Sequence, residues 1–245
     1  MITPTLPVIL EPANSELAVA LLRDYFAPPD GRGSDFRGAH FERIGRRWND
    51  PRYANKITAS DIVAVNCLSV DIPGDVSISL LGTDTEPVHE LLSQIPLDLD
   101  LWHATDEQIG PNSPARKLWT FLRRPGIGQL TTGKLMARKR ARLVPVYDAI
   151  IAAELGLKNP GAHWDMMRNL MNTGAGQAPL HLQLAALGQR AGLDMTLITP
   201  LRVFDVATWY FGNPKLAKRV AWIAQDYGTK VPDRPPFAAP PIADY

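Results

Sequence analysis

Apolar residues recur at three- and four-residue intervals along most of this 245-residue chain. This spacing places them on one face of a helix, whereas no segment shows the clear two-residue alternation of a half-buried strand. The segments with this helical pattern are 15–26, 57–70, 85–95, 112–124, 130–141, 149–156, 162–172, 180–192 and 199–212. The sequence therefore predicts a mainly α-helical fold.

Several of these segments begin with a residue that favours a helix start. Thr58 precedes an apolar run and has Asp61 three residues on, which is typical of a capping box. Ser113 and Thr199 are each followed by a proline, which is tolerated at the first helical position. These signals fix where the predicted helices begin.

Composition divides the chain into three segments. Residues 1–56 are rich in Pro, Gly and Arg and are expected to pack on the core as an irregular extension. Residues 57–215 carry most of the helical pattern and are expected to form the core, with a hairpin over 113–141. Residues 216–245 are expected to form a C-terminal helix and a proline-rich tail.

Composition also excludes several classes of protein. A single cysteine, Cys67, cannot form an internal disulfide, a cysteine-based zinc site or a cysteine-ligated iron–sulfur cluster. The five histidines are scattered without ligand spacing, so we expect no catalytic metal. No apolar run reaches the roughly 20 residues that span a bilayer, and the first residues lack signal-peptide order. We expect a cytoplasmic protein without a membrane partner.

Charge is distributed unevenly although the net charge is only +1. The stretch from Ala115 to Tyr147 has no acidic residue, and such a basic stretch is expected to meet an anionic partner. A solvated helix face is the alternative, although such faces normally mix both signs. The nine basic residues are Arg116, Lys117, Arg123, Arg124, Lys134, Arg138, Lys139, Arg140 and Arg142.

A Gly-Ile-Gly turn lies within this basic stretch, between two predicted helices. Gly126 and Gly128 permit positive φ and close approach of another backbone, and Ile127 is expected to point into the core. The following helix would then turn its unpaired N–H groups and positive dipole end towards a phosphate. A turn that only joins two packed helices is the alternative. The residues predicted to hold a DNA backbone are Gly126, Ile127, Gly128, Thr131, Lys134, Arg138 and Arg140.

The turn "PGIG", the helix after it and the segment "RLVPVYD" resemble the helix–hairpin–helix DNA glycosylase superfamily. In that superfamily the catalytic Asp follows the second glycine by twenty residues, the separation between Gly128 and Asp148 here. The resemblance implies a helical glycosylase-like bundle that flips a base out of DNA and hydrolyses its glycosidic bond. The stretch "KLMARKR…LVPVYD" is also similar to an uncharacterised actinobacterial family, a likeness that implies no activity.

Through this resemblance Asp148 is assigned as the catalytic carboxylate, which stabilises the oxocarbenium ion and orients water. A helix cap is an alternative role for Asp148, and the two roles are compatible. Leu130 occupies the position of the lysine that forms a Schiff base in bifunctional members, so we expect no lyase activity. The segment 71–125 is shorter than in the superfamily, which argues against an ordinary duplex substrate.

Four residues are candidates for the base pocket. Ser69 and Asp71 match the end of a core helix of the superfamily, and Tyr147 lies next to Asp148. Glu42 lies outside the common core, in "FRGAHFERIG", where His40 could pair with it or the segment could simply start a helix. Trp102, Trp119 and Trp164 could stack on a base. Aromatic residues at helical spacing more often belong to the core.

Three hypotheses therefore stand. The chain could be a monofunctional DNA glycosylase, a non-catalytic DNA-binding module on the same scaffold, or an interaction protein whose basic face meets an acidic protein or RNA. The first predicts DNA as the partner, no obligate protein partner and no cofactor, with a monovalent cation at the hairpin left open.

Overall fold

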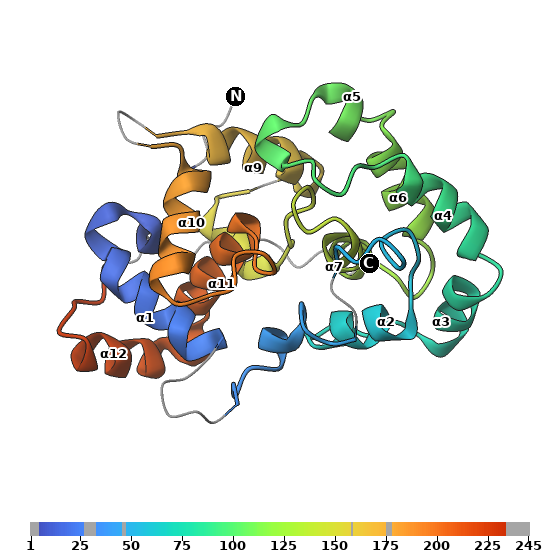
Figure 1. Ribbon diagram of the computed structural model, residues 1–245. Coiled ribbons are helices and arrows are strands. Elements are labelled where there is room, and N and C mark those ends of the chain that lie inside the picture. The colour runs from blue at the N-terminus through green and yellow to red at the C-terminus, as the bar shows by residue number, and fades with distance from the viewer. Residues whose placement is uncertain (1–4, 27–32, 46–47, 158, 175–177, 234–245) are drawn as a thin grey trace. The chain divides into compact units, whose positions relative to one another are not determined.

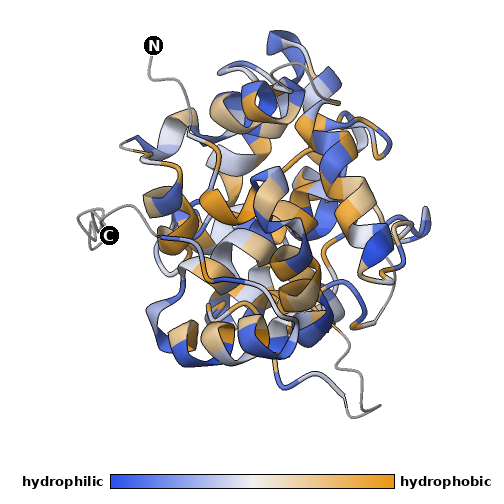
Figure 2. Ribbon diagram, turned by 90° about the vertical axis from the view of Figure 1, so that its left-hand side faces the viewer, coloured by the Kyte–Doolittle hydropathy of each residue, from blue (hydrophilic) through white to orange (hydrophobic). Residues whose placement is uncertain are grey.

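The computed structural model describes residues 5–26, 33–45, 48–157, 159–174 and 178–233. These residues are mainly helical, and among them the only β-type pairing is an isolated bridge between Arg124 and Ile127. The mainly α-helical prediction is confirmed. Most helices carry both hydrophobic and hydrophilic residues, as Figure 2 shows.

The chain folds as two compact units. Unit 1 contains residues 1–35 and 147–245, and unit 2 contains residues 36–146. These units differ from the three segments expected from composition, because the N-terminal extension is divided between them. The proline-rich tail from residue 234 onwards lies outside the described residues.

Unit 2 contains the predicted hairpin. Its central helix is α7 (Gln129–Lys139), and every residue from Thr131 to Arg140 is buried. Helices α2 and α6 pack directly against α7, and α4 and α5 pack on α6 (Figure 1). The other elements of unit 2 are η3 (Arg37–His40), α2 (Ala59–Asn66), α3 (Gly74–Leu81), α4 (Thr85–Ser93), η4 (Leu101–His103), α5 (Asp106–Ile109) and α6 (Pro114–Leu122).

Unit 1 is built in a similar way around α11 (Pro200–Gly212), which is buried along almost its whole length. Helices α1, α8 and α10 pack against it. The other elements of unit 1 are η1 (Val8–Leu10), η2 (Pro12–Asn14), α1 (Ser15–Phe26), α8 (Ala149–Glu154), η5 (Pro160–Ala162), α9 (His163–Asn172), α10 (Leu180–Arg190), η6 (Pro214–Leu216) and α12 (Ala217–Asp226).

Candidate functional site

The predicted turn between α6 and α7 is present in unit 2. Gly126 has φ +85°, the left-handed conformation that favours glycine. The backbones of Arg124 and Ile127 pair across the turn, with the Ile127 N–H donating to the Arg124 carbonyl at 2.9 Å. Ile127 is 1% exposed, which confirms that its side chain anchors the turn in the core.

Gly126 also allows the turn to approach the start of α3. A Cβ atom at Gly126 would lie 2.9 Å from Cγ of Pro73, closer than a real Cβ can approach. Pro73 is the N-cap residue of α3. The glycine is therefore needed for both its backbone conformation and its packing.

Gly128 serves a different purpose from the one expected. Its φ is −77°, so it does not need the conformational freedom of glycine. It is the N-cap of α7 and has no side chain that could cap the first N–H groups of the helix. Gly128 and Leu130 are exposed, whereas the side chain of Thr131 is buried and does not reach out towards a ligand.

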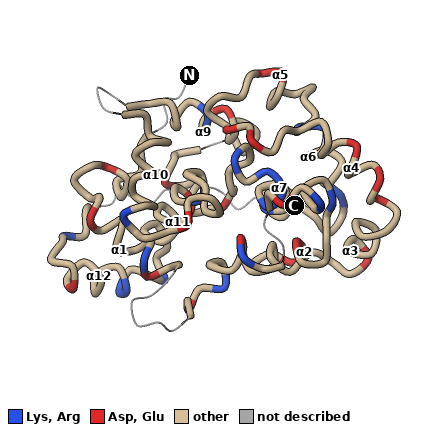
Figure 3. The backbone as a smooth tube through the Cα atoms, in the orientation of Figure 1, with Lys and Arg blue, Asp and Glu red and all other residues tan. Residues whose placement is uncertain are grey.

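The basic residues of α7 are buried rather than exposed, which corrects the expectation that they reach a DNA backbone. Lys134 is 4% exposed, and Arg138 and Arg140 are each 1% exposed. Figure 3 shows Lys and Arg in blue along α7. Their charged groups form hydrogen bonds inside unit 2. These residues therefore form neither the expected DNA contact nor the alternative solvated face.

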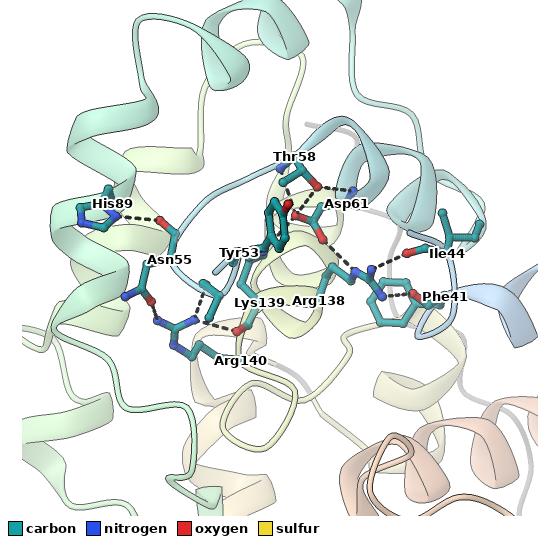
Figure 4. Close-up of polar contacts among 11 residues, drawn as sticks. Phe41, Ile44, Tyr53, Asn55, Thr58, Asp61, His89, Arg138, Lys139 and Arg140 are labelled. Carbon is teal, nitrogen blue, oxygen red and sulfur yellow. Dashed lines mark hydrogen bonds and ion pairs between the residues drawn. The ribbon is translucent and has the colours of Figure 1, made fainter. Parts of the chain in front are cut away.

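One carboxylate, Asp61 of α2, meets two of these cations (Figure 4). Arg138 Nε lies 2.9 Å from Asp61 Oδ1, and Lys139 Nζ lies 2.9 Å from Asp61 Oδ2. Asp61 Oδ2 also accepts hydrogen bonds from the backbone N–H and the hydroxyl of Thr58, completing the predicted capping box. The same carboxylate thus starts α2 and neutralises part of α7.

Backbone carbonyl groups accept further hydrogen bonds from these cations. Arg138 donates to the carbonyls of Phe41 and Ile44, Lys139 to that of Tyr53 and Lys134 to that of Leu68. Arg140 donates to carbonyls of residues 54, 92, 95 and 139 and to the Asn55 side chain. Figure 4 shows its contact with Asn55. The basic end of α7 therefore holds together chain segments that are distant in sequence.

Burial and pairing set the ionisation of this cluster. Burial works to raise the pKa of Asp61, but Lys139 and Arg138 outweigh it and lower the pKa below its ordinary value. Burial lowers the pKa of Lys139, which Asp61 counteracts. Burial lowers the pKa of Arg140 to about 10. Asp61 and Arg140 are therefore charged at neutral pH.

The exposed positive charge of the hairpin comes from α6 instead. Ala115, Leu118 and Leu122 form the buried stripe of this helix, while Lys117 and Arg123 are exposed on the other side. Arg116 is half-buried. Arg124 is occupied by Asp84, with its Nη1 2.6 Å from Asp84 Oδ2. Anion-binding groups at this hairpin are therefore to be sought on α6 and at the start of α7.

Asp148 lies in unit 1, at the start of α8. Its Oδ1 accepts a hydrogen bond from the Ile150 N–H at 2.9 Å, so it is the N-cap of that helix. Tyr147 is half-buried, and burial together with the Asp148 charge raises its pKa. The ring of His163 meets the Tyr147 ring edge to face, with centroids 5.1 Å apart.

His163 is a residue that the sequence did not single out. It is 2% exposed, and its Nε2 has no hydrogen-bond partner among the described residues. Burial lowers the pKa of His163 to about 3, so the imidazole is neutral at physiological pH. Only its place at the start of the amphipathic helix α9 could have indicated that it is buried.

The remaining pocket candidates, Ser69, Asp71 and Glu42, belong to unit 2. Ser69 and Asp71 are exposed on the link between α2 and α3, where Ser69 has φ +61°. Glu42 is buried in unit 2, whereas His40, two residues before it, is exposed. Trp164 is buried, as expected for a core residue, whereas Trp102 and Trp119 are partly exposed.

Two classes of site are not found within the described part of the chain. No group of three or more His, Cys, Asp or Glu residues there is arranged to hold a metal ion. No helix there is long and apolar enough to cross a membrane.

Comparison with known proteins identifies a family of unknown function. No curated protein and no solved structure matches the chain significantly. A family described as "Family of unknown function (DUF6308)" matches residues 18–212. The match covers most of both units, including the hairpin, the buried cations of α7 and Asp148. The chain therefore belongs to the DUF6308 family.

Proposed function

We propose that this protein is a monofunctional DNA glycosylase with a helix–hairpin–helix fold. In this proposal the α6–α7 hairpin holds the DNA backbone and Asp148 promotes hydrolysis of a glycosidic bond. The observation that carries the proposal is the hairpin itself. Its glycine turn is anchored by buried Ile127, and α7 begins at an exposed glycine without a capping side chain.

A phosphate is the ligand that the start of α7 favours. The helix has 11 residues, so its aligned peptide dipoles leave a partial positive charge at Gln129. Its first N–H groups lack acceptors within the helix. The cations that support this contact are Lys117 and Arg123 of α6, in place of the buried cations of α7.

Asp148 supplies the chemistry in this proposal. Hydrolysis breaks the bond between the sugar C1′ and the base nitrogen and forms a bond between C1′ and a water oxygen. The base nitrogen takes the bonding electron pair and gains a proton, and the water loses one proton through the carboxylate. A carboxylate stabilises the positive charge that develops on the sugar. Such an enzyme would act on the DNA of the cytoplasm.

A lysine-dependent strand cleavage is not part of this proposal. Leu130 lies in the first turn of α7 and is 37% exposed, in the position that corresponds to the Schiff-base lysine of bifunctional members. A leucine side chain has no nucleophilic group. We therefore expect base release to leave an intact abasic site.

A non-catalytic DNA-binding protein is the second candidate, and one observation favours it. Asp148 caps α8, which gives this residue a structural role that needs no chemistry. The hairpin would then bind DNA in the same way, and no base would be released.

Asp148→Asn separates these two functions. Asparagine caps helices as well as aspartate does, so α8 should keep its start and the variant should fold. We expect loss of base release with DNA affinity equal or higher, because a negative charge is removed. Asp165→Asn removes the same charge from an exposed position of α9 and should change neither property. Base release by Asp148→Asn at the wild-type rate would exclude the catalytic assignment.

A further inference from the structure

Trp119 lies between two arginines on α6. The guanidinium carbon of Arg123 lies 4.6 Å from the centroid of the Trp119 ring, and that of Arg116 lies 5.8 Å from it. The three residues follow one another at intervals of three and four positions, so they share one side of the helix. We call Arg116, Trp119 and Arg123 the α6 ladder.

The α6 ladder contributes little to the core of unit 2. The core face of α6 is formed by Ala115, Leu118 and Leu122, which are all buried. Arg123 is exposed, and Trp119 and Arg116 are each only half-buried. A large aromatic ring with arginines beside it is thus kept partly accessible to solvent and ordered by cation–π contacts.

We propose that the α6 ladder is a stacking surface for the bases of single-stranded or locally unpaired DNA. This inference rests on the proposed function and names its substrate class. Indole rings and guanidinium planes both stack on nucleic-acid bases, and such stacking depends little on base identity. In a duplex each base face is covered by its neighbours, so only an unpaired base can offer its face to Trp119.

Charge around the ladder fits the same partner. Lys117 is exposed on α6, and Arg123 directly precedes the turn that leads to the start of α7. No acidic residue occurs between Ala115 and Tyr147. A strand stacked on the ladder would therefore find positive groups for its phosphates close by in sequence. An acidic protein could use the charges but would gain less than stacked bases do from the half-buried indole of Trp119.

The test compares the binding of two DNA ligands of equal length to the 245-residue protein. Fluorescence anisotropy is measured with labelled oligo-dT and with a blunt duplex, at two salt concentrations. We expect wild type to prefer the single strand and Trp119→Leu to lose about tenfold or more of that affinity, with little change for the duplex. Arg123→Lys keeps the charge but removes the planar group, and it should lose part of the same preference.

Trp222→Leu is the matched control, because Trp222 is 63% exposed on α12 of unit 1 and belongs to no such ladder among the described contacts. Its affinities should equal those of wild type. Circular dichroism establishes that both tryptophan variants fold. Unchanged single-strand affinity in Trp119→Leu, an equal loss for both ligands, or tighter binding of oligo-U RNA than of oligo-dT would overturn the inference.

The inference and the proposed function fail separately. Base release from duplex DNA by wild type and by Trp119→Leu alike would support the glycosylase proposal and refute the stacking surface. A single-strand preference that depends on Trp119, without base release from any DNA, would support the stacking surface and refute the glycosylase proposal.

Discussion

At the scale of single residues, the most unusual feature is the number of cations buried on α7. Lys134, Arg138, Lys139 and Arg140 are each no more than 4% exposed, and Asp61 is the carboxylate that pairs with two of them. A charge removed from water is costly unless it is paired and hydrogen-bonded. The carbonyl groups of segments 41–44, 53–54 and 92–95 meet this requirement together with Asp61.

Asp61→Asn should destabilise the protein strongly. The variant leaves Arg138 and Lys139 buried without their counter-charge, so we expect a loss of about 3–5 kcal/mol in the free energy of unfolding. Urea unfolding at pH 7, followed by tryptophan fluorescence, measures this loss. Asp84→Asn breaks the partly exposed pair with Arg124 and should cost only about 1 kcal/mol or less. Equal losses in the two variants would contradict this account of the buried cluster.

His163 should make stability depend on pH. Its pKa is about 3 in the folded protein because of burial, against an ordinary value of 6.5 when unfolded. Between these values the unfolded chain binds a proton that the folded protein does not. Stability should therefore fall as pH decreases, by up to about 1.4 kcal/mol per pH unit.

The comparison with His163→Phe isolates this effect, because phenylalanine keeps a ring against Tyr147 but cannot titrate. Urea unfolding between pH 6 and pH 4 should show wild type losing stability relative to the variant. Asp61 is present in both proteins, so its titration cancels from the difference between them. Parallel stability curves for the two proteins would show that His163 is not buried as described.

At the scale of elements, the hairpin depends on one glycine. Gly126→Ala places a Cβ at positive φ and 2.9 Å from Pro73, so we expect a loss of about 1–2 kcal/mol in the free energy of unfolding. Gly74→Ala is a suitable control next to the same proline, because a Cβ there has no neighbour within 4 Å. Thermal unfolding of both variants makes the comparison. A Gly126→Ala protein as stable as Gly74→Ala would mean that the turn has another conformation.

The positions of most helices could be predicted from the sequence. Helix α1 has the expected bounds, and Thr58, Ser113 and Thr199 cap the helices that follow them. These features are local, since periodicity and capping act within a few residues. Helix α3 was not predicted because its segment "GDVSISLL" starts with glycine and contains two serines, so its periodicity is weak.

The burial of α7 could not be predicted in the same way. Its cations are paired mainly with backbone carbonyl groups, and every residue type carries a carbonyl, so these partners leave no mark in the sequence. Asp61, their acidic partner among the described contacts, is explained locally as part of a capping box. The unpaired Nε2 of His163 is likewise a property of tertiary packing.

At the scale of the whole molecule, the residues named in the proposal are divided between the two units. Unit 2 carries the hairpin, the exposed cations of α6 and the α6 ladder, and unit 1 carries Asp148 at the start of α8. The correction from α7 to α6 changes which residues should bind DNA. It does not change the proposal that DNA is bound at the hairpin.

Salt dependence tests the revised DNA contact. Lys117→Glu with Arg123→Glu should weaken DNA binding and flatten the dependence of affinity on salt, because these cations would no longer replace the counterions of phosphates. Lys215→Glu with Lys218→Glu changes the same charge at exposed positions of unit 1 and serves as the control. Anisotropy titrations between about 50 and 200 mM salt measure both double variants. The affinity of a protein that contacts many phosphates falls on the order of a thousandfold or more over this range. Equal effects of the two double variants would place the DNA contact elsewhere.

The most direct measurement of the central claim is mass spectrometry of free bases after the protein is incubated with DNA. The DNA panel extends from damaged oligonucleotides to heavily modified phage genomes, in single-stranded and duplex form, with Asp148→Asn beside wild type. We expect wild type to release a base that Asp148→Asn does not release. Release by both proteins, or by neither while salt-sensitive DNA binding persists, would contradict the assignment of Asp148 as the catalytic residue of a glycosylase.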